Sequence, residues 1–133
     1  MSKIVSGFNR VVIDWDGTCV ESVYPDEGGW LEGAIDAIKA ILASDVEVEI
    51  LSTRIAPTEV DETALLPEGQ VERELAYIRR MLDEAGLQVV GIWQKPWKPG
   101  AIAYIDDKGI RFDDWKQAMR DLEGLLPQKE MVI

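Results

Sequence analysis

The chain has 133 residues, with 25 acidic against 14 basic side chains and a net charge of −11. This charge repels nucleic acid backbones and anionic membranes over most of the surface, so a polymer substrate is disfavoured. The sequence has no histidine and one cysteine, Cys19. These counts exclude serine–histidine and cysteine–histidine catalysis, and they leave too few nitrogen and sulfur ligands for a structural zinc site. Hard cations bound by oxygen ligands remain.

The length predicts a single domain over residues 1–133. No apolar run approaches the roughly 20 residues of a membrane span, and the first ten residues, MSKIVSGFNR, lack the apolar stretch of a signal peptide. We therefore expect a cytoplasmic protein.

Residues 10–14 (RVVID) form a short apolar run that ends in an acid, which is typical of a buried parallel strand opening onto a site. Residues 31–44 carry apolar side chains at helical spacing and predict a helix. Residues 46–51 (VEVEIL) then alternate as a second strand does.

Residues 70–85 again show helical spacing, and Gly86 is expected to end that helix. A third strand is predicted within residues 88–93 (QVVGIW) and a fourth at residues 101–105 (AIAYI). Asp113 is expected to cap a last helix. That helix would carry four apolar side chains inward: Trp115, Met119, Leu122 and Leu126.

Strands that alternate with helices predict an α/β fold with a parallel sheet covered on both faces, and ligands bind such sheets at the carboxyl ends of the strands. Two irregular segments, residues 19–30 and 54–69, contain proline and glycine. Loops of this length in a small domain are commonly functional. Within the first segment Cys19 is expected to be a small buried filler, and Trp15 just before it is expected to pack beneath the sheet.

The clearest pattern is VVIDWDGT at residues 11–18. A buried strand would hold Asp14 rigidly, and Gly17 would let the chain turn so that Asp16 faces the same space. Near the other end of the chain, AYIDDKGIRF at residues 103–112 places two adjacent acids after a strand. Adjacent carboxylates repel each other, and a divalent cation offsets that repulsion.

Two shorter patterns follow strand two and precede strand four. ILSTR at residues 50–54 offers a hydroxyl at Ser52, with Thr53 as the competing assignment. The dipeptide Lys98-Pro99 lies just before the fourth strand, and Lys95-Pro96 repeats it three residues earlier. The basic side chains in or beside these segments could together hold one phosphate group: Arg54, Lys95, Lys98, Lys108 and Arg111.

Together, and in this order, the four patterns resemble the motifs of the haloacid dehalogenase-like hydrolases over residues 11–112. The resemblance implies a Rossmann-like three-layer domain with strand order 4-1-2-3. It also implies a magnesium-dependent phosphatase that acts through an aspartyl-phosphate. Asp14 would be the nucleophile and Asp16 the general acid and base, while Ser52 and Lys98 would bind the phosphoryl group.

The same resemblance implies that magnesium is held by the Asp14 side chain, the Asp16 carbonyl and Asp106, with Asp107 binding directly or through water. The family usually inserts a cap domain, whereas this chain has only the two irregular loops. We therefore expect a capless member whose pocket is shaped by those loops or by a neighbouring copy. The substrate class stays open among sugar phosphates, nucleotides and polynucleotide ends.

Two other readings compete with the phosphatase. A phospho-accepting signalling receiver also uses acids at strand ends, a hydroxyl and a lysine around magnesium. It has no need for a general acid two residues after the nucleophile, and Asp16 supplies one. The second alternative is an idle magnesium-binding interaction module.

Overall fold

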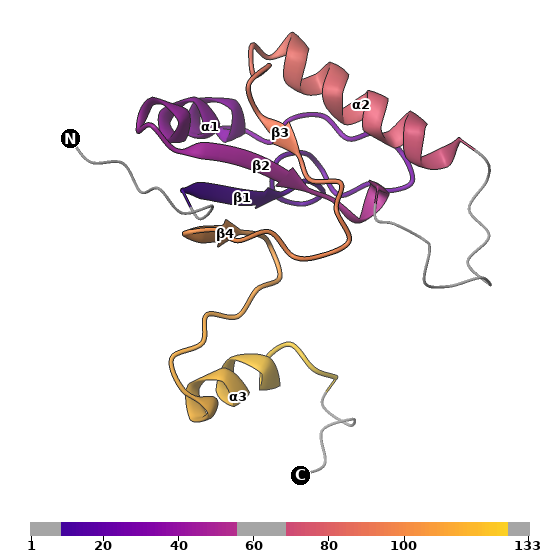
Figure 1. Ribbon diagram of the computed structural model, residues 1–133. Helices are drawn as coiled ribbons and strands as arrows, with labels where there is room; N and C mark the ends of the chain where they lie inside the picture. The colour runs from indigo at the N-terminus through magenta and orange to yellow at the C-terminus, as the bar shows by residue number, and fades with distance from the viewer. Residues whose placement is uncertain (1–8, 56–68, 128–133) are drawn as a thin grey trace.

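The computed structural model describes residues 9–55 and 69–127, which form an α/β arrangement with four strands and three α-helices (Figure 1). In chain order the elements are β1 (Arg10–Asp14), α1 (Ala34–Ala43), β2 (Glu47–Leu51), a 3-10 turn (Thr53–Ile55), α2 (Gln70–Glu84), β3 (Gly91–Ile92), β4 (Ala103–Ile105) and α3 (Trp115–Glu123).

The four strands form one parallel sheet in the order β3-β2-β1-β4. Counted from the β4 edge, the same neighbours give the expected order 4-1-2-3. Val11 of β1 pairs with Val48 of β2 on one side and with Ala103 of β4 on the other. Because β1 runs parallel to both of these strands, the loops that follow β1, β2 and β4 lie at the same edge of the sheet.

One face of the sheet packs against α1 and α2, which lie on the same side (Figure 1). Alternate residues of β1 and β2, such as Ile13 and Ile50, meet Ile38 of α1 and Ile78 of α2 in a single core. Trp15 is fully buried and makes edge-to-face contacts with the rings of Trp30 and Tyr77 at centroid distances of 5.3 and 5.8 Å. Trp15 therefore packs in the core, as expected.

The opposite face of the sheet is not covered by a helix in the described part of the chain. Val12 and its β4 neighbour Tyr104 point to this face, and the loop between β3 and β4 packs there. The Tyr104 hydroxyl donates a hydrogen bond to the carbonyl of Pro99, which is fully buried. The expected three-layer arrangement is therefore replaced by two layers, because the β3–β4 connection contains no helix and α3 does not return to the sheet.

The prediction for the last helix was wrong in two respects. Its N-cap is Asp114, not Asp113, and the Asp114 carboxylate accepts a hydrogen bond from the Gln117 amide at 2.8 Å. The four apolar side chains were expected inward, yet α3 buries none of its residues and Trp115 is 73% exposed. Helical spacing identifies an apolar face, but it does not say what covers that face.

The other element boundaries shift by a few residues. The first helix begins at Ala34, after Gly33, whose φ of 87° is outside the helical region. Gly86 ends α2 as expected: it has a φ of 77°, and the neighbouring Leu87 amide bonds to the Leu82 carbonyl at 2.8 Å. The third strand contains only Gly91 and Ile92.

No helix within residues 9–55 and 69–127 is long and apolar enough to cross a membrane. Most of the irregular segment 54–69, namely residues 56–68, lies outside the described part of the chain.

Candidate functional site

A pocket of about 610 Å³ opens where β1, β2 and β4 end. It contains four of the six residues singled out from the sequence, Asp14, Asp16, Asp106 and Asp107, but neither Ser52 nor Lys98. The other lining residues come from the same strands and the loops beside them: Val12, Ser22, Tyr24, Leu51, Thr53, Tyr104, Ile105, Lys108 and Gly109.

Asp14 and Asp107 meet at the centre of this edge of the sheet. Asp14 is the last residue of β1, and Asp107 follows β4 closely. Gly17 makes the approach of Asp107 possible: its φ is 84°, and a Cβ atom there would overlap the Asp107 carboxylate. The turn expected from the Asp-Gly sequence is therefore present, and only glycine fits it.

The pKa of Asp14 is raised to about 6. Burial is the main cause, because it disfavours the charged form. The negative charge of Asp107 and, more weakly, that of Asp106 act in the same direction. This edge of the sheet thus holds more negative charge than its surroundings stabilise, and a cation would relieve the excess.

This pKa has a consequence for stability in metal-free protein. Between pH about 4 and about 6 folded Asp14 holds a proton that the unfolded chain has released, so the Asp14 contribution to stability falls as pH rises through this range. The unfolding free energy of wild type minus that of Asp14→Asn should therefore fall as pH rises through this range. Both free energies are measured by urea titration with a chelator present. The same difference at every pH would contradict the raised pKa.

The Asp106 carboxylate is engaged within its own loop. One of its oxygens accepts hydrogen bonds from the amides of Lys108 and Gly109. Within residues 9–55 and 69–127, no group of three or more acidic, histidine or cysteine side chains is placed to hold a metal ion. Two convergent carboxylates, Asp14 and Asp107, are nevertheless enough for magnesium, which is often bound by one or two carboxylates together with water and substrate phosphate.

Asp16 is held at the pocket wall by Arg54. Arg54 Nη2 lies 2.8 Å from Asp16 Oδ1, and Nε lies 2.9 Å from Oδ2. Such a two-point pairing fixes the orientation of the carboxylate as well as its charge. The side chain of Asp16 is still 18% exposed, so it is both anchored and open to the pocket.

Arg54 also ties three separate segments to the site. Its Nη1 donates to both carboxylate oxygens of Glu74 in α2, at 3.1 and 3.3 Å, and its Nη2 donates to the carbonyl of Asp26. The guanidinium lies over the rings of Tyr24 and Tyr77, at 4.9 and 5.1 Å from their centroids. The side chain is fully buried, so this network replaces its hydration.

The pKa of Arg54 reflects the same balance. Burial acts to lower it, but the hydrogen bonds and charges of Asp16 and Glu74 act more strongly and raise it. From the sequence, Arg54 is expected only as one of five basic side chains that could together hold one phosphate group. Its position directly after Ser52 and Thr53 places it near the site, but its pairing with Asp16 and Glu74 is not expected, because these acids are 38 and 20 residues away.

The two candidate hydroxyl residues lie in different surroundings. Ser52 is buried, and its Oγ accepts a hydrogen bond from the Arg54 amide at 3.1 Å. Thr53, at the start of the 3-10 turn, lines the pocket. Thr53, the competing assignment for the hydroxyl, therefore reaches the pocket, and Ser52 does not.

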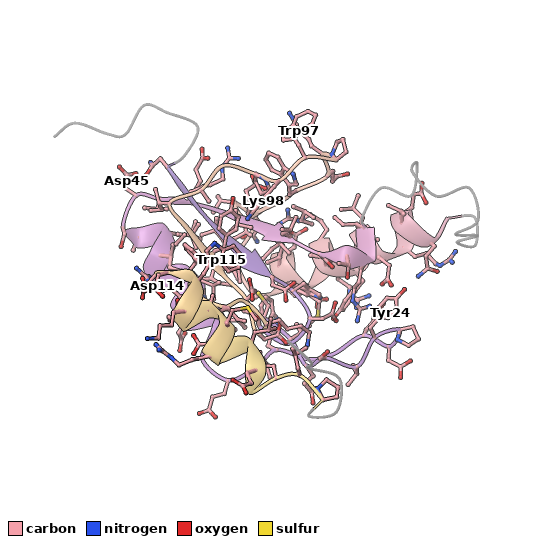
Figure 2. All side chains as sticks on the ribbon, turned by 90° about the horizontal axis from the view of Figure 1, so that it is seen from below. Tyr24, Asp45, Trp97, Lys98, Asp114 and Trp115 are labelled. Atoms are coloured by element: carbon pink, nitrogen blue, oxygen red, sulfur yellow. The ribbon has the colours of Figure 1, made fainter. Side chains whose placement is uncertain are left out.

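The two candidate lysines both lie on the exposed loop between β3 and β4. Lys98 Nζ lies 4.3 Å from the ring centroid of Tyr104, which lines the pocket. Lys95 Nζ instead lies over Trp97 at 5.2 Å. Figure 2 shows Trp97 toward the outside of the molecule and Lys98 nearer its centre. Of the two candidates, Lys98 is therefore the closer to the pocket. The lysine that lines the pocket, however, is Lys108.

Cys19 is 1% exposed. Its pKa is raised to about 12, first by burial and then by the charge of Asp14. A thiol that stays protonated is a poor nucleophile, which agrees with the expected role as a buried filler.

No family model matches this chain, and searches of curated proteins and of solved structures return no significant match. Any assignment of function therefore depends on the motifs and on the geometry of the pocket.

Proposed function

We propose that this protein is a magnesium-dependent phosphatase of the haloacid dehalogenase-like type, with a Rossmann-like sheet and Asp14 as its nucleophile. The proposal is based mainly on the position of Asp14. It ends β1, an inner strand of the sheet, and opens onto a pocket of about 610 Å³. The carboxylate of Asp107 lies beside it, and Arg54 holds the carboxylate of Asp16 at the pocket wall.

In the proposed reaction the ionised Asp14 carboxylate attacks the phosphorus atom of a phosphate monoester. The bond between phosphorus and the leaving oxygen breaks, and Asp16 gives that oxygen a proton. A water molecule then attacks the aspartyl-phosphate while Asp16 takes up its proton, which restores Asp14 and releases inorganic phosphate. Arg54 acts as a positioning residue: its Nη2 contact with Asp16 Oδ1 holds the side chain at the pocket wall, and Asp16 Oδ2 would carry the proton that is given up in the first step and taken up in the second.

Magnesium fits the donors present, since Asp14 and Asp107 converge, and the charge of Asp107 adds to burial in raising the pKa of Asp14. When bound there, it would neutralise charge on the phosphoryl oxygens. The Asp16 carbonyl would complete the proposed ligand set, and Asp106, one oxygen of which is bonded within its own loop, would join it only through its other oxygen. Thr53 replaces Ser52 as the proposed hydroxyl donor to the phosphoryl group, because Thr53 lines the pocket.

The proposal is tested by incubating the purified protein with a panel of small phosphomonoesters and Mg²⁺ and measuring released phosphate. We expect turnover that stops with a chelator and returns with added Mg²⁺. Protein that folds normally and releases no phosphate from any member of the panel would favour the idle module.

The two lysines give a matched pair of variants. Lys98→Ala should lower kcat/KM on the order of a hundredfold, the effect expected when a preorganised charge is removed from the transition state. Lys95→Ala should change kcat/KM less than threefold, because its ammonium lies against Trp97. Both lysines are exposed, so neither variant should disturb folding. The opposite ranking of the two kcat/KM values would move the phosphate-binding role to Lys95.

A further inference from the structure

Exposed apolar side chains are concentrated near the end of the described chain. Of the eleven large apolar residues that are well exposed in residues 9–55 and 69–127, seven lie between positions 102 and 125. We call these seven the C-terminal apolar surface: Ile102, Tyr104, Ile105, Phe112, Trp115, Met119 and Leu125.

This surface has two parts of different shape. The first is the helix α3, where Trp115 and Met119 are four residues apart and share one face. The Phe112 ring extends that face by an edge-to-face contact with Trp115, at a centroid distance of 5.2 Å. The second part is β4, an edge strand whose three residues are all exposed.

The two parts do not cover each other within one chain. A segment from residue 106 to residue 114 leads away from β4, and α3 lies beyond it, apart from the sheet (Figure 1). In Figure 2, which views the molecule from below, α3 lies across the near side and Trp115 is in its first turn. A helix with an apolar face and a strand with exposed apolar residues are thus both uncovered in the same molecule.

The size of the surface suits association with another protein chain. Its seven side chains are between 36% and 73% exposed. With 150–250 Å² for each fully exposed aromatic side chain and somewhat less for the others, they present on the order of 800 Å² over the two parts together, about the area that each partner buries in a standard interface.

We propose that two copies of this chain associate, with α3 of each copy packing against β4 of the other. A second copy is the occupant that the surface fits best, because it presents both parts in the required form. A two-fold axis places each helix on the strand of the other copy, so the assembly closes as a dimer.

Light scattering after size exclusion, at 1 to 100 µM protein and 0.15 M salt, tests the association without any substrate. We expect wild-type protein to show twice the chain mass of 14.9 kDa at the higher concentrations. Trp115→Glu should raise the dissociation constant at least a hundredfold and give monomers, and it should fold because α3 buries none of its residues. The control is Val89→Glu, at a residue 78% exposed outside the surface, which should remain a dimer.

A wild-type monomer at all concentrations would overturn the proposal, and so would a Trp115→Glu variant that dimerises like the wild type. The first result would leave α3 to cover its own sheet or another protein, and the second would place the interface elsewhere. Salt gives an independent check. Each copy carries a charge of −11, so the dimer should tighten when salt rises from 0.05 to 0.3 M.

Discussion

Replacing Asp14 with asparagine is expected to reduce steady-state phosphate release by a factor on the order of a thousand or more. The substitution keeps the shape of the side chain but removes the nucleophilic oxygen anion and one of the two charges that face the metal site. The fold should persist, because Asp14 is only partly buried and its loss also removes the repulsion from Asp107.

The matched control is Asp36→Asn, which removes an equal charge from the exposed face of α1. It should retain wild-type turnover and a wild-type far-ultraviolet spectrum. Asp14→Asn should give the same spectrum with phosphate release at background. Release by Asp14→Asn within tenfold of wild type would contradict its role as the nucleophile.

Replacing Arg54 with alanine should have the largest effect on stability. The substitution leaves Glu74, which is 5% exposed, and the anchored Asp16 without their positive partner. Breaking a buried ion pair by removing one member typically costs about 3–5 kcal/mol. The loss is measured as a fall in unfolding free energy during urea titration at pH 7.

The matched control is Arg80→Ala. Arg80 pairs with Glu27 at a similar distance, 3.0 Å, but both side chains are about half exposed. Exposed pairs contribute about 0–1 kcal/mol, so the two arginines separate the effect of burial from that of charge. Equal losses for Arg54→Ala and Arg80→Ala would contradict the buried network.

Arg54→Lys tests the positioning role apart from stability. Lysine keeps the charge but cannot make the two-point contact with Asp16. We expect kcat to fall at least tenfold with little change in KM, because Asp16 acts on the reacting oxygens and not in ground-state binding. A wild-type kcat would limit Arg54 to a structural role.

The sequence predicted the sheet well because the relevant information is local. The run RVVID is typical of a buried strand, and glycine after Asp16 and at position 86 marks turns that other residues adopt poorly. The opposite face of the sheet could not be predicted. Apolar spacing in residues 115–126 shows which side of α3 is apolar, whereas the covering of that side depends on contacts far along the chain or in another copy.

For the candidate site, too, the sequence predicts some features and not others. Asp14, Asp16, Asp106 and Asp107 reach one pocket because each lies just beyond the carboxyl end of a parallel strand, which sequence patterns reveal. The partnership of Arg54 with Asp16 and Glu74 joins three distant segments, and nothing local signals it. The choice between Ser52 and Thr53 depends on how the 3-10 turn rotates two adjacent side chains, which composition does not determine.

The central claim is that Asp14 forms a phosphoryl intermediate that water then hydrolyses. The most direct measurement is rapid-quench phosphate transfer from a small phosphomonoester with Mg²⁺, combined with mass spectrometry of the peptide containing Asp14. We expect a phosphoryl group on Asp14 at up to one per chain, followed by many turnovers of phosphate release, and neither in Asp14→Asn. Stable phosphorylation without turnover would instead identify a receiver, and turnover with no phosphoryl group on Asp14 would contradict the mechanism.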